Sequence, residues 1–444
     1  MKKLMPTALR FTLGALVAMG VCRGWYAQEQ KIDANERARV EIMLQDIHDA
    51  LKKNYYDAAY HGLDIDARYK TYLERVQKSE TLGDAFRTVA AYLAGLDDSH
   101  TYFIPPRRSY RAEYGYRLQL VGDACYVTQV RPETDAAKKL RPGDQVQSLD
   151  GFAVNRKDLW QLEYYLRQLA PKPATEFTVR SPSGEVRKEQ VLTKYEPRKH
   201  LQDITTAGGI NDFLRLGLEE EEQRHALRQR YAEQEGVLIW KMPSFTVGDD
   251  EIDRMMGLAR KHEILILDLR DNPGGYVSTL DRMVGSFFDH NVTIATQVTR
   301  KGDKAQIAKS RGKDIFTGKL FVLVDSGSAS AAELFARIMQ LEHRGTVVGD
   351  RSSGLVMEAL YYPFHTNGDI QVFYAASITS ADLRMADGKS LEKVGVTPDV
   401  VVLPTGSHLA EGQDPVLAKA AELAGIKLDA AAAGKLFPFE WPPI

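Results

Sequence analysis

Strands that alternate with helices fill much of the second half of this 444-residue chain and restrict the folds open to it. Short apolar runs of strand type recur between Val237 and Val402, and patterns of helical spacing separate them. The runs lie at Val237–Lys241, Ile264–Arg270, Val292–Val298, Leu320–Val324, Thr346–Val348 and Ile370–Tyr374. This alternation predicts an α/β core, in which functional sites lie at the ends of strands.

A serine-containing turn follows one of these strands. After Phe321–Val324 comes Gly327-Ser328-Ala329-Ser330-Ala331-Ala332-Glu333, and apolar residues at helical spacing follow the turn. Small neighbours leave the Ser330 hydroxyl uncovered, and the N–H groups and dipole of a helix start can hold an oxyanion. A helix cap rich in serine and alanine is the plain alternative.

The turn resembles the nucleophile motif of the carboxy-terminal processing peptidases (tail-specific proteases) and of the tricorn core protease. That motif reads approximately G-S-A-S-A-S-E, and its second serine attacks. The resemblance covers nearly the whole mature chain, and it implies a ClpP/crotonase-like core with Ser330 as nucleophile. The processing peptidases use a lysine base from a downstream loop, but Leu355 takes its place here. Leucine cannot accept a proton, so a Ser-Lys dyad at these positions is excluded.

A histidine far upstream is therefore the expected base. Leu96-Asp97-Asp98-Ser99-His100-Thr101 resembles the Ser-His segment of the tricorn-type branch, in which the histidine takes the serine's proton. The resemblance implies that Ser99 and Glu392 orient the His100 ring, and Asp350 and Asp399 are weaker candidates for this role. Histidine suits the task because its pKa lies near neutral pH. A capping histidine and a solvated turn glutamate are the alternatives.

Two glycines after another strand are candidates for the oxyanion hole. Asp271-Asn272-Pro273-Gly274-Gly275 follows the Ile264–Arg270 run and resembles the family's D-x-R-x-N-x-G-G segment. Glycines let a substrate carbonyl approach bare backbone. The resemblance implies that the N–H of Gly274 or Gly275 pairs with the N–H of Ala331. A plain Asn-Pro-Gly-Gly turn remains the alternative.

Residues 113–197 resemble a PDZ domain, chiefly through the L-x-P-G-D-x-V-x-x-L-D-G signature at residues 140–151. Strands are expected at Tyr116–Val121, at Cys125–Val130 and near 176–180, with a helix near 156–169. PDZ domains bind the carboxyl terminus of a peptide by adding it as a strand. The resemblance implies a carboxylate-binding segment at Tyr114, Gly115, Tyr116 and Arg117. A fold retained only as a spacer is the alternative.

Composition and the amino terminus set the remaining bounds. Hydrophobic residues make up 44% of the chain, its formal net charge is −2, and no basic tract favours nucleic acid. Residues 1–27 read as a secretory signal, which predicts a periplasmic or extracellular protein that meets the membrane only if the signal stays uncleaved. The signal could be cleaved after Gly24 or after Ala27. Either cleavage removes Cys22 and leaves Cys125 as the single cysteine, so no internal disulfide can form. Neither a metal site nor a cofactor is expected.

The predicted fold is therefore an α/β multi-domain protein. Its expected parts are a signal (1–27), an N-terminal helical region (28–112), the PDZ-like β domain (113–197), a helical linker (198–235), the catalytic core (236–404) and a C-terminal tail (405–444). The helical region serves to deliver His100 or, alternatively, as an oligomerisation hairpin, and the oligomeric state stays open.

The leading functional hypothesis is a serine endopeptidase that forms an acyl-enzyme on exported, poorly structured polypeptides recruited by their carboxyl termini. The second is a non-catalytic, PDZ-containing peptide-binding protein that has lost turnover with the lysine. A hydrolase of small esters or amides ranks last, because it would make the PDZ-like domain superfluous.

Overall fold

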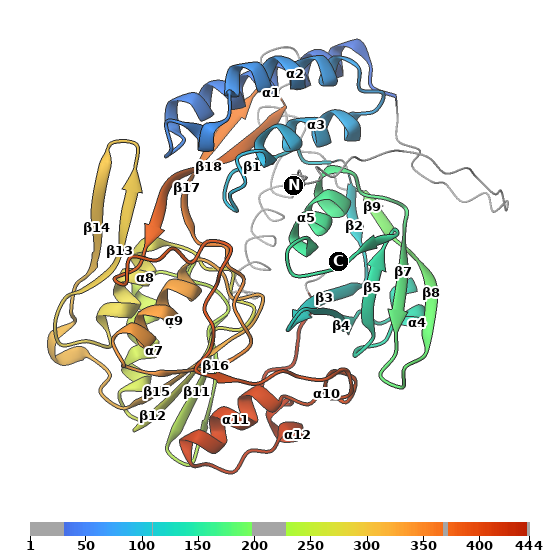
Figure 1. Ribbon diagram of the computed structural model, residues 1–444. Coiled ribbons are helices and arrows are strands. Elements are labelled where there is room, and N and C mark those ends of the chain that lie inside the picture. Colours follow the sequence, from blue (N-terminus) through green and yellow to red (C-terminus); the bar gives the residue numbers. More distant parts are fainter. Residues whose placement is uncertain (1–30, 109, 198–227, 367–371, 442–444) are drawn as a thin grey trace, which may run out of the picture.

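A computed structural model describes residues 31–108, 110–197, 228–366 and 372–441 of the chain. Figure 1 shows three parts arranged around a centre: N-terminal helices, a β domain formed by residues 110–197, and an α/β core to which the last helices attach. We call the second part the middle domain. The mixed α/β architecture predicted from the sequence is confirmed.

Three helices form the N-terminal part: α1 (Ala34–Asn54), α2 (Ile65–Gln77) and α3 (Leu82–Ala94). The side chains of Asp33, Asp64 and Thr81 cap their first turns. A short 3₁₀ turn (Tyr60–Gly62) joins α1 to α2. The apolar faces of the helices pack on one sheet of the core, so this part is continuous with the core.

The middle domain is an antiparallel sheet in the order β3-β4-β5-β7-β8, which leaves β3 at one edge. β2 and β9 pair separately as a two-stranded antiparallel ribbon. The predicted strands at Tyr116–Val121, Cys125–Val130 and 176–180, and the helix near 156–169, are confirmed. Its elements are β2 (Tyr110–Glu113), β3 (Tyr116–Val121), β4 (Ala124–Val130), α4 (Asp135–Lys139), β5 (Gln145–Leu149), β6 (Phe152–Ala153), α5 (Leu159–Glu163), a π-helical turn (Tyr164–Leu169), β7 (Ala174–Arg180), β8 (Val186–Leu192) and β9 (Lys194–Pro197).

The core is built on a sheet in the order β10-β11-β12-β15-β16-β19, parallel except for the β10-β11 pair. Helices cover both faces of this sheet, and its strands β11, β12 and β15 are accordingly almost continuously apolar. The strands are β10 (Arg230–Gln234), β11 (Val237–Lys241), β12 (Ile264–Asp268), β15 (Lys319–Val324), β16 (Thr346–Gly349) and β19 (Val400–Val401). The helices are α7 (Asp249–Ala259), α8 (Val277–Gly285) and α9 (Ala331–Leu341) on one face, and α11 (Pro415–Ala424) and α12 (Ala430–Ala433) on the other.

A second sheet of the core is antiparallel and connects it to the N-terminal helices. It consists of β1 (Tyr102–Ile104), β13 (Val292–Thr299), β14 (Gly302–Ala308), β17 (Met357–His365) and β18 (Phe373–Arg384). Because β1 begins two residues after His100 and pairs with β18, this sheet ties the His100 segment to the core. Helix α10 (Gly406–Ala410) contacts β4 of the middle domain.

Several expected boundaries were wrong. The helical linker predicted for residues 198–235 ends in a strand, β10, because Arg230–Gln234 pairs with β11 as a hairpin. Residues 28–112 are not helical throughout, since β1 and β2 follow the three helices. The strand expected at Ile370–Tyr374 begins, within the described residues, at Phe373 and continues to Arg384. The predicted signal and most of the linker lie outside the described residues.

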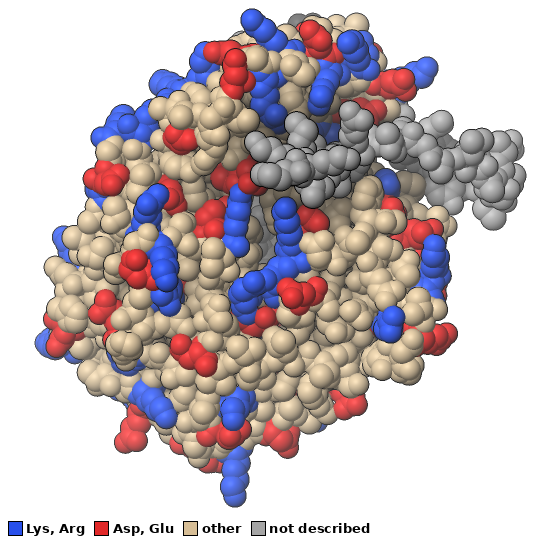
Figure 2. Space-filling view, in the orientation of Figure 1, with Lys and Arg blue, Asp and Glu red and all other residues tan. Residues whose placement is uncertain are grey.

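The charged side chains of both signs intermingle on the face drawn in Figure 2. None of the helices in the described part of the chain is both long enough and apolar enough to cross a membrane.

Candidate active site

Ser330 lies in a sharp turn between β15 and α9. Its backbone has φ 53° and ψ −118°, a conformation that L-residues rarely adopt. Two contacts hold it there: the Ser330 N–H donates to Leu355 O at 3.0 Å and to Glu333 Oε2 at 3.1 Å. A serine on a strained strand-to-helix turn presents its hydroxyl at the end of the sheet, as nucleophiles of hydrolases do.

The first serine of the motif has a different environment. Ser328 is fully buried, and its hydroxyl donates to Leu269 O at 2.8 Å and accepts from the Asp325 N–H at 3.0 Å. These bonds use the hydroxyl to hold the turn against the end of β12. Ser328 is therefore a structural residue, and Ser330 is the motif serine that is available for chemistry.

The His100 segment places three of the predicted site residues in one hydrogen-bonded chain. Ser99 Oγ lies 2.7 Å from His100 Nδ1 and donates to Glu392 Oε2 at 2.8 Å. The Ser99 N–H also donates to Glu392 Oε1 at 2.9 Å. Since the single hydroxyl proton of Ser99 goes to the carboxylate, the Nδ1 of neutral His100 must be the donor to Ser99. Nε2 is then the unprotonated nitrogen, which can accept a proton.

Asp98, which sequence reasoning missed, anchors this segment. Its Oδ1 accepts from the N–H groups of His100 and Thr101 at 2.9 and 2.7 Å and from Thr379 Oγ1 at 2.7 Å. Its Oδ2 accepts from the Tyr55 hydroxyl at 2.8 Å. The carboxylate thus joins the residue that follows α1, the His100 segment and β18. A signal existed in the sequence, because an Asp two residues before a chain reversal commonly accepts from backbone N–H groups.

Burial sets the charge states of the His100 chain. It lowers the pKa of His100 below its ordinary value, and the nearby Asp98 carboxylate opposes this only in part. Burial also raises the pKa of Glu392, although the donors Val356 N–H and Ser99 favour its charged form. At neutral pH the imidazole is therefore neutral and ready to accept a proton.

We call residues 325–330, between β15 and α9, the nucleophile turn. Glu333 connects the loop of residues 352–355 to this turn. This fully buried carboxylate accepts from Ser352 Oγ at 2.6 Å, from Gly354 N–H at 2.7 Å and from Leu355 N–H at 3.1 Å, besides Ser330 N–H. Burial raises the pKa of Glu333 to about 7 in spite of these donors. The Leu355 carbonyl accepts from the Ser330 N–H at 3.0 Å, so Leu355 lies next to Ser330, and its side chain cannot accept a proton.

The loop of residues 352–356 connects Ser330 to the hydrogen-bonded chain of Glu392, Ser99 and His100. Leu355 O accepts from Ser330 N–H, and the next residue, Val356, donates its N–H to Glu392 Oε2 at 2.9 Å. The predicted residues Ser99, His100, Glu392 and Ser330 therefore belong to one connected network. No hydrogen bond joins Ser330 Oγ to the His100 ring in this structure, where both residues are described.

The candidate oxyanion residues lie beside Ser330. A Cβ on Gly274 would come within 2.7 Å of Ser330 Cβ and 2.9 Å of Ala331 N, so only glycine leaves space there. The Gly274 N–H donates to Asn272 Oδ1 at 2.9 Å. Among the described residues, neither Gly275 N–H nor Ala331 N–H donates to an acceptor. These two groups are the better candidates for holding a negative oxygen.

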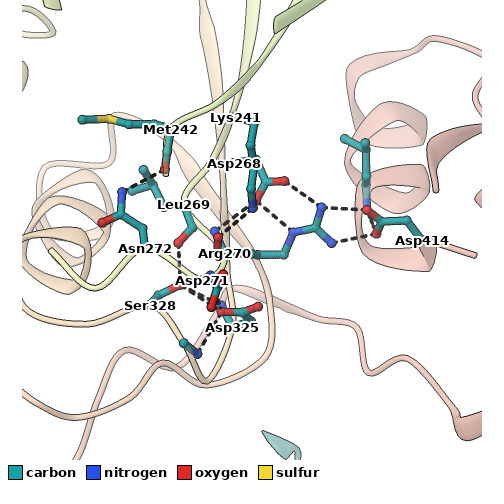
Figure 3. Close-up of polar contacts among 12 residues, drawn as sticks. Lys241, Met242, Asp268, Leu269, Arg270, Asp271, Asn272, Asp325, Ser328 and Asp414 are labelled. Carbon is teal, nitrogen blue, oxygen red and sulfur yellow. Dashed lines mark hydrogen bonds and ion pairs between the residues drawn. The ribbon is translucent and has the colours of Figure 1, made fainter. Parts of the chain in front are cut away.

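A buried ionic network holds residues 271–275, which we call the glycine loop, in place (Figure 3). Arg270 contacts both carboxylate oxygens of Asp268 and both of Asp414, the residue that caps α11. Although burial alone would raise it, Arg270 and Lys241 hold the pKa of Asp268 below its ordinary range. Asn272 Nδ2 donates to Met242 O at 2.9 Å. The loop is thus fastened to the sheet and to the last helices.

The weaker candidates for orienting the base are engaged elsewhere. Asp350 accepts from Arg156 Nη2 at 2.7 Å and from the Gly122 N–H at 2.8 Å, and so binds the middle domain. Asp399 accepts from the Val347 N–H at 2.8 Å and from Gln340. Neither carboxylate contacts His100, so the hypothesis that one of them orients the ring was wrong.

The candidate peptide-binding segment, Tyr114–Arg117, leads into the edge strand β3. Gly115 has φ 70°, donates its N–H to Glu113 Oε1 at 2.8 Å and accepts from the Arg131 N–H at 2.8 Å. Arg117 points out of the domain and forms an ion pair with Asp271 of the glycine loop. The middle domain therefore meets the candidate active site along β3.

The core of the chain, without the His100 segment, matches a known family model. Residues 236–402 match the model described as Peptidase family S41. The chain is 23% identical over 322 residues to the tail-specific protease of Haemophilus influenzae. The aligned region covers 68% of this chain but only 43% of that protein. It is 24% identical over 422 residues to the carboxyl-terminal-processing protease of Synechocystis, covering 89% of this chain and 87% of that protein.

Solved structures agree at the level of the fold. Mature CPAF in complex with lactacystin matches with a TM-score of 0.61 at 14% identity, over 85% of this chain and 96% of CPAF. The photosystem II D1 C-terminal processing protease matches with a TM-score of 0.50 at 19% identity, over 90% of this chain and 99% of that one.

Proposed function

We propose that this protein, whose core matches Peptidase family S41 and whose sequence is similar to carboxyl-terminal-processing proteases, is a serine endopeptidase of the Ser-His type. Its substrates are exported, poorly structured polypeptides. Ser330 is the nucleophile, His100 the base, and Ser99 and Glu392 position the ring. The protein acts in the periplasm or outside the cell.

The observation that carries this proposal is the chain from Glu392 through Ser99 to His100. It fixes the tautomer that leaves Nε2 unprotonated, and burial keeps the ring neutral. Leu355 at the lysine position removes the other base that the family uses. A neutral, oriented histidine in this network supports proton transfer from Ser330.

The reaction follows from these groups. Ser330 Oγ attacks the substrate carbonyl carbon while its proton passes to His100 Nε2, and Gly275 and Ala331 N–H groups receive the oxyanion. Breaking the C–N bond gives an acyl-enzyme, and His100 returns the proton to the leaving amine. Water then repeats the sequence on the ester and releases Ser330. Substrate binding has to bring Ser330 Oγ and Nε2 within hydrogen-bond distance, as is common for sites without substrate.

Recruitment by carboxyl termini belongs to the same proposal. The middle domain, taken as a PDZ domain, offers the edge strand β3 for strand addition and the Tyr114–Arg117 segment for the terminal carboxylate. Its contact with the glycine loop through Arg117 and Asp271 supports delivery of the bound chain toward Ser330.

A second candidate is a peptide-binding protein without catalytic turnover. The absence of a hydrogen bond between Ser330 Oγ and His100, both described, favours it. A serine that is never activated would leave the protein able to bind polypeptides and unable to cleave them.

Labelling with a serine-directed fluorophosphonate separates the two candidates. Wild-type protein is expected to be labelled, Ser330→Ala is expected to lose all labelling, and Ser328→Ala is expected to keep it because the Ser328 hydroxyl is already bonded. Mass spectrometry of the labelled peptide locates the adduct. Equal labelling of wild type and Ser330→Ala would remove the nucleophile assignment, and an unlabelled wild type would favour the binding protein.

A further inference from the structure

A short run of aromatic residues near the end of the chain crosses from the core to the middle domain. We call Phe437–Trp441 the aromatic segment. At its start, Phe437 packs against the cluster around α11, and Arg230 Nη1 donates to Pro438 O at 2.8 Å. Arg230 also lies 3.9 Å from Glu440. The segment is therefore anchored on the core before it reaches the middle domain.

The other end of the aromatic segment lies on two cations of the middle domain. The Arg117 guanidinium lies 4.9 Å from the centre of the Phe439 ring, and that of Arg131 lies 5.4 Å from the Trp441 ring. The two rings meet edge to face with centroids 5.1 Å apart. Cation–π contacts at these distances are attractive but individually weak, so this end can dissociate.

Both cations lie at the candidate peptide-binding segment. Arg117 is part of it, and Arg131 is built into it: Arg131 Nη1 contacts Glu113 Oε2 at 2.5 Å, and its N–H donates to Gly115 O. Although Arg117 also pairs with Asp271 and Arg131 with Glu113, guanidinium groups next to an edge strand can still donate to a peptide carboxylate. The aromatic segment thus covers the place where a peptide end would bind.

We propose that the aromatic segment is an intramolecular cover of the peptide-binding site, which an incoming carboxyl terminus must displace. The inference rests on the proposed recruitment by the middle domain. In the covered state the binding-competent fraction of the protein is small, and the apparent dissociation constant is raised by the inverse of that fraction. Polypeptides that present a free carboxyl terminus gain access only when they compete with Phe439 and Trp441.

The test is a titration of full-length protein carrying Ser330→Ala, so that no probe is consumed. The probe is one fluorescently labelled, unstructured peptide with a free carboxyl terminus, and its amidated form. The double variant Phe439→Ala/Trp441→Ala removes both rings of the cover. The matched control is Tyr361→Ala/Phe373→Ala, which removes two exposed aromatic side chains from the antiparallel sheet of the core.

The cover variant is expected to bind the free-acid peptide roughly tenfold more tightly than the wild type, and the control variant to match the wild type. Wild-type binding with no gain in the cover variant would overturn the cover while leaving recruitment intact. No binding by any variant would refute recruitment and the cover together, whereas labelling at Ser330 would still test the peptidase on its own.

A second readout follows the segment itself. Hydroxyl-radical footprinting of Trp441, which is half buried, is expected to increase when wild-type protein is saturated with the free-acid peptide. Unchanged oxidation at saturation would contradict displacement, because a covered and an occupied site could then coexist.

Discussion

Ser99 decides which nitrogen of His100 can act as a base. A serine hydroxyl has one proton to donate, and here the Glu392 carboxylate receives it. The neighbouring imidazole must then donate through Nδ1, and its lone pair faces away on Nε2. A carboxylate bound directly to the ring would do the same, but the interposed serine lets Glu392 hold two backbone N–H groups as well.

The pH dependence of peptide cleavage tests the charge state of His100. Because burial lowers the pKa of the ring, the neutral form is expected to persist below pH 6.5, the ordinary value for histidine. The acid limb of kcat/KM should therefore have its midpoint below pH 6.5, since this parameter reports the free enzyme. A midpoint near 7 would instead match Glu333, whose pKa burial raises to about that value.

At the scale of elements, the strands that could be predicted are those whose own residues form a recognisable apolar pattern. Strands β11 and β15 are continuous apolar runs because helices cover both faces of their sheet, and they were predicted within one residue. Strands β14 and β17 were missed. β14 is mostly exposed and polar, and β17 exists through its pairing with β18, a partner whose position no local pattern reveals.

The candidate site divides in the same way. Ser330, His100 and Glu392 were proposed as site residues because short motifs resemble those of a family. The roles of Asp98 and Glu333 were missed because they depend on contacts between distant elements: Asp98 bonds to Thr379, and Glu333 to the loop at 352–355. The sequence also could not predict that the Gly274 N–H is bonded while the Gly275 N–H has no acceptor among the described residues, since this depends on the Asn272 side chain.

Glu333 gives a prediction about the loop that it binds. Its pKa in the folded protein, about 7, lies above the ordinary 4.5, so the folded state binds this proton more tightly than the unfolded state. The corresponding stability is present below pH 4.5 and is lost as the pH rises through about 7, by up to about 3 kcal/mol. Urea denaturation between pH 5 and 8 should show a weaker loss for Glu333→Gln than for wild type.

The matched control is Glu342→Gln, at the exposed end of the same helix. It is expected to lose stability with pH as the wild type does. Parallel pH profiles for wild type and Glu333→Gln would mean that Glu333 titrates normally and is not the buried group described here.

At the scale of the whole molecule, the middle domain contacts both loops that form the candidate site. Gln119 donates to Asp325 of the nucleophile turn at 2.5 Å, and Arg117 pairs with Asp271 of the glycine loop. Ser326 Oγ donates to Leu120 O of β3 at 2.6 Å. A peptide added along β3 would have to replace some of these contacts, so binding in the middle domain and the shape of the site are physically linked.

Amidation of a peptide's carboxyl terminus tests recognition by the middle domain. Strand addition supplies backbone hydrogen bonds to either form, but only the free acid supplies a charge for the Tyr114–Arg117 segment. Binding to full-length Ser330→Ala protein is expected to weaken by about 1–3 kcal/mol on amidation, the cost of a polar site left unsatisfied. Equal affinities for both forms would make the domain a spacer or gate.

The central claim is that His100 has replaced a lysine as the base, and turnover of an unstructured peptide by two single variants tests it most directly. His100→Ala is expected to lower kcat/KM by roughly three decades or more. Lys393→Ala, which removes the lysine beside Glu392 and its ion pair with Asp97, is expected to stay within a few-fold of wild type. Near wild-type turnover by His100→Ala, together with an inactive Lys393→Ala, would contradict the account.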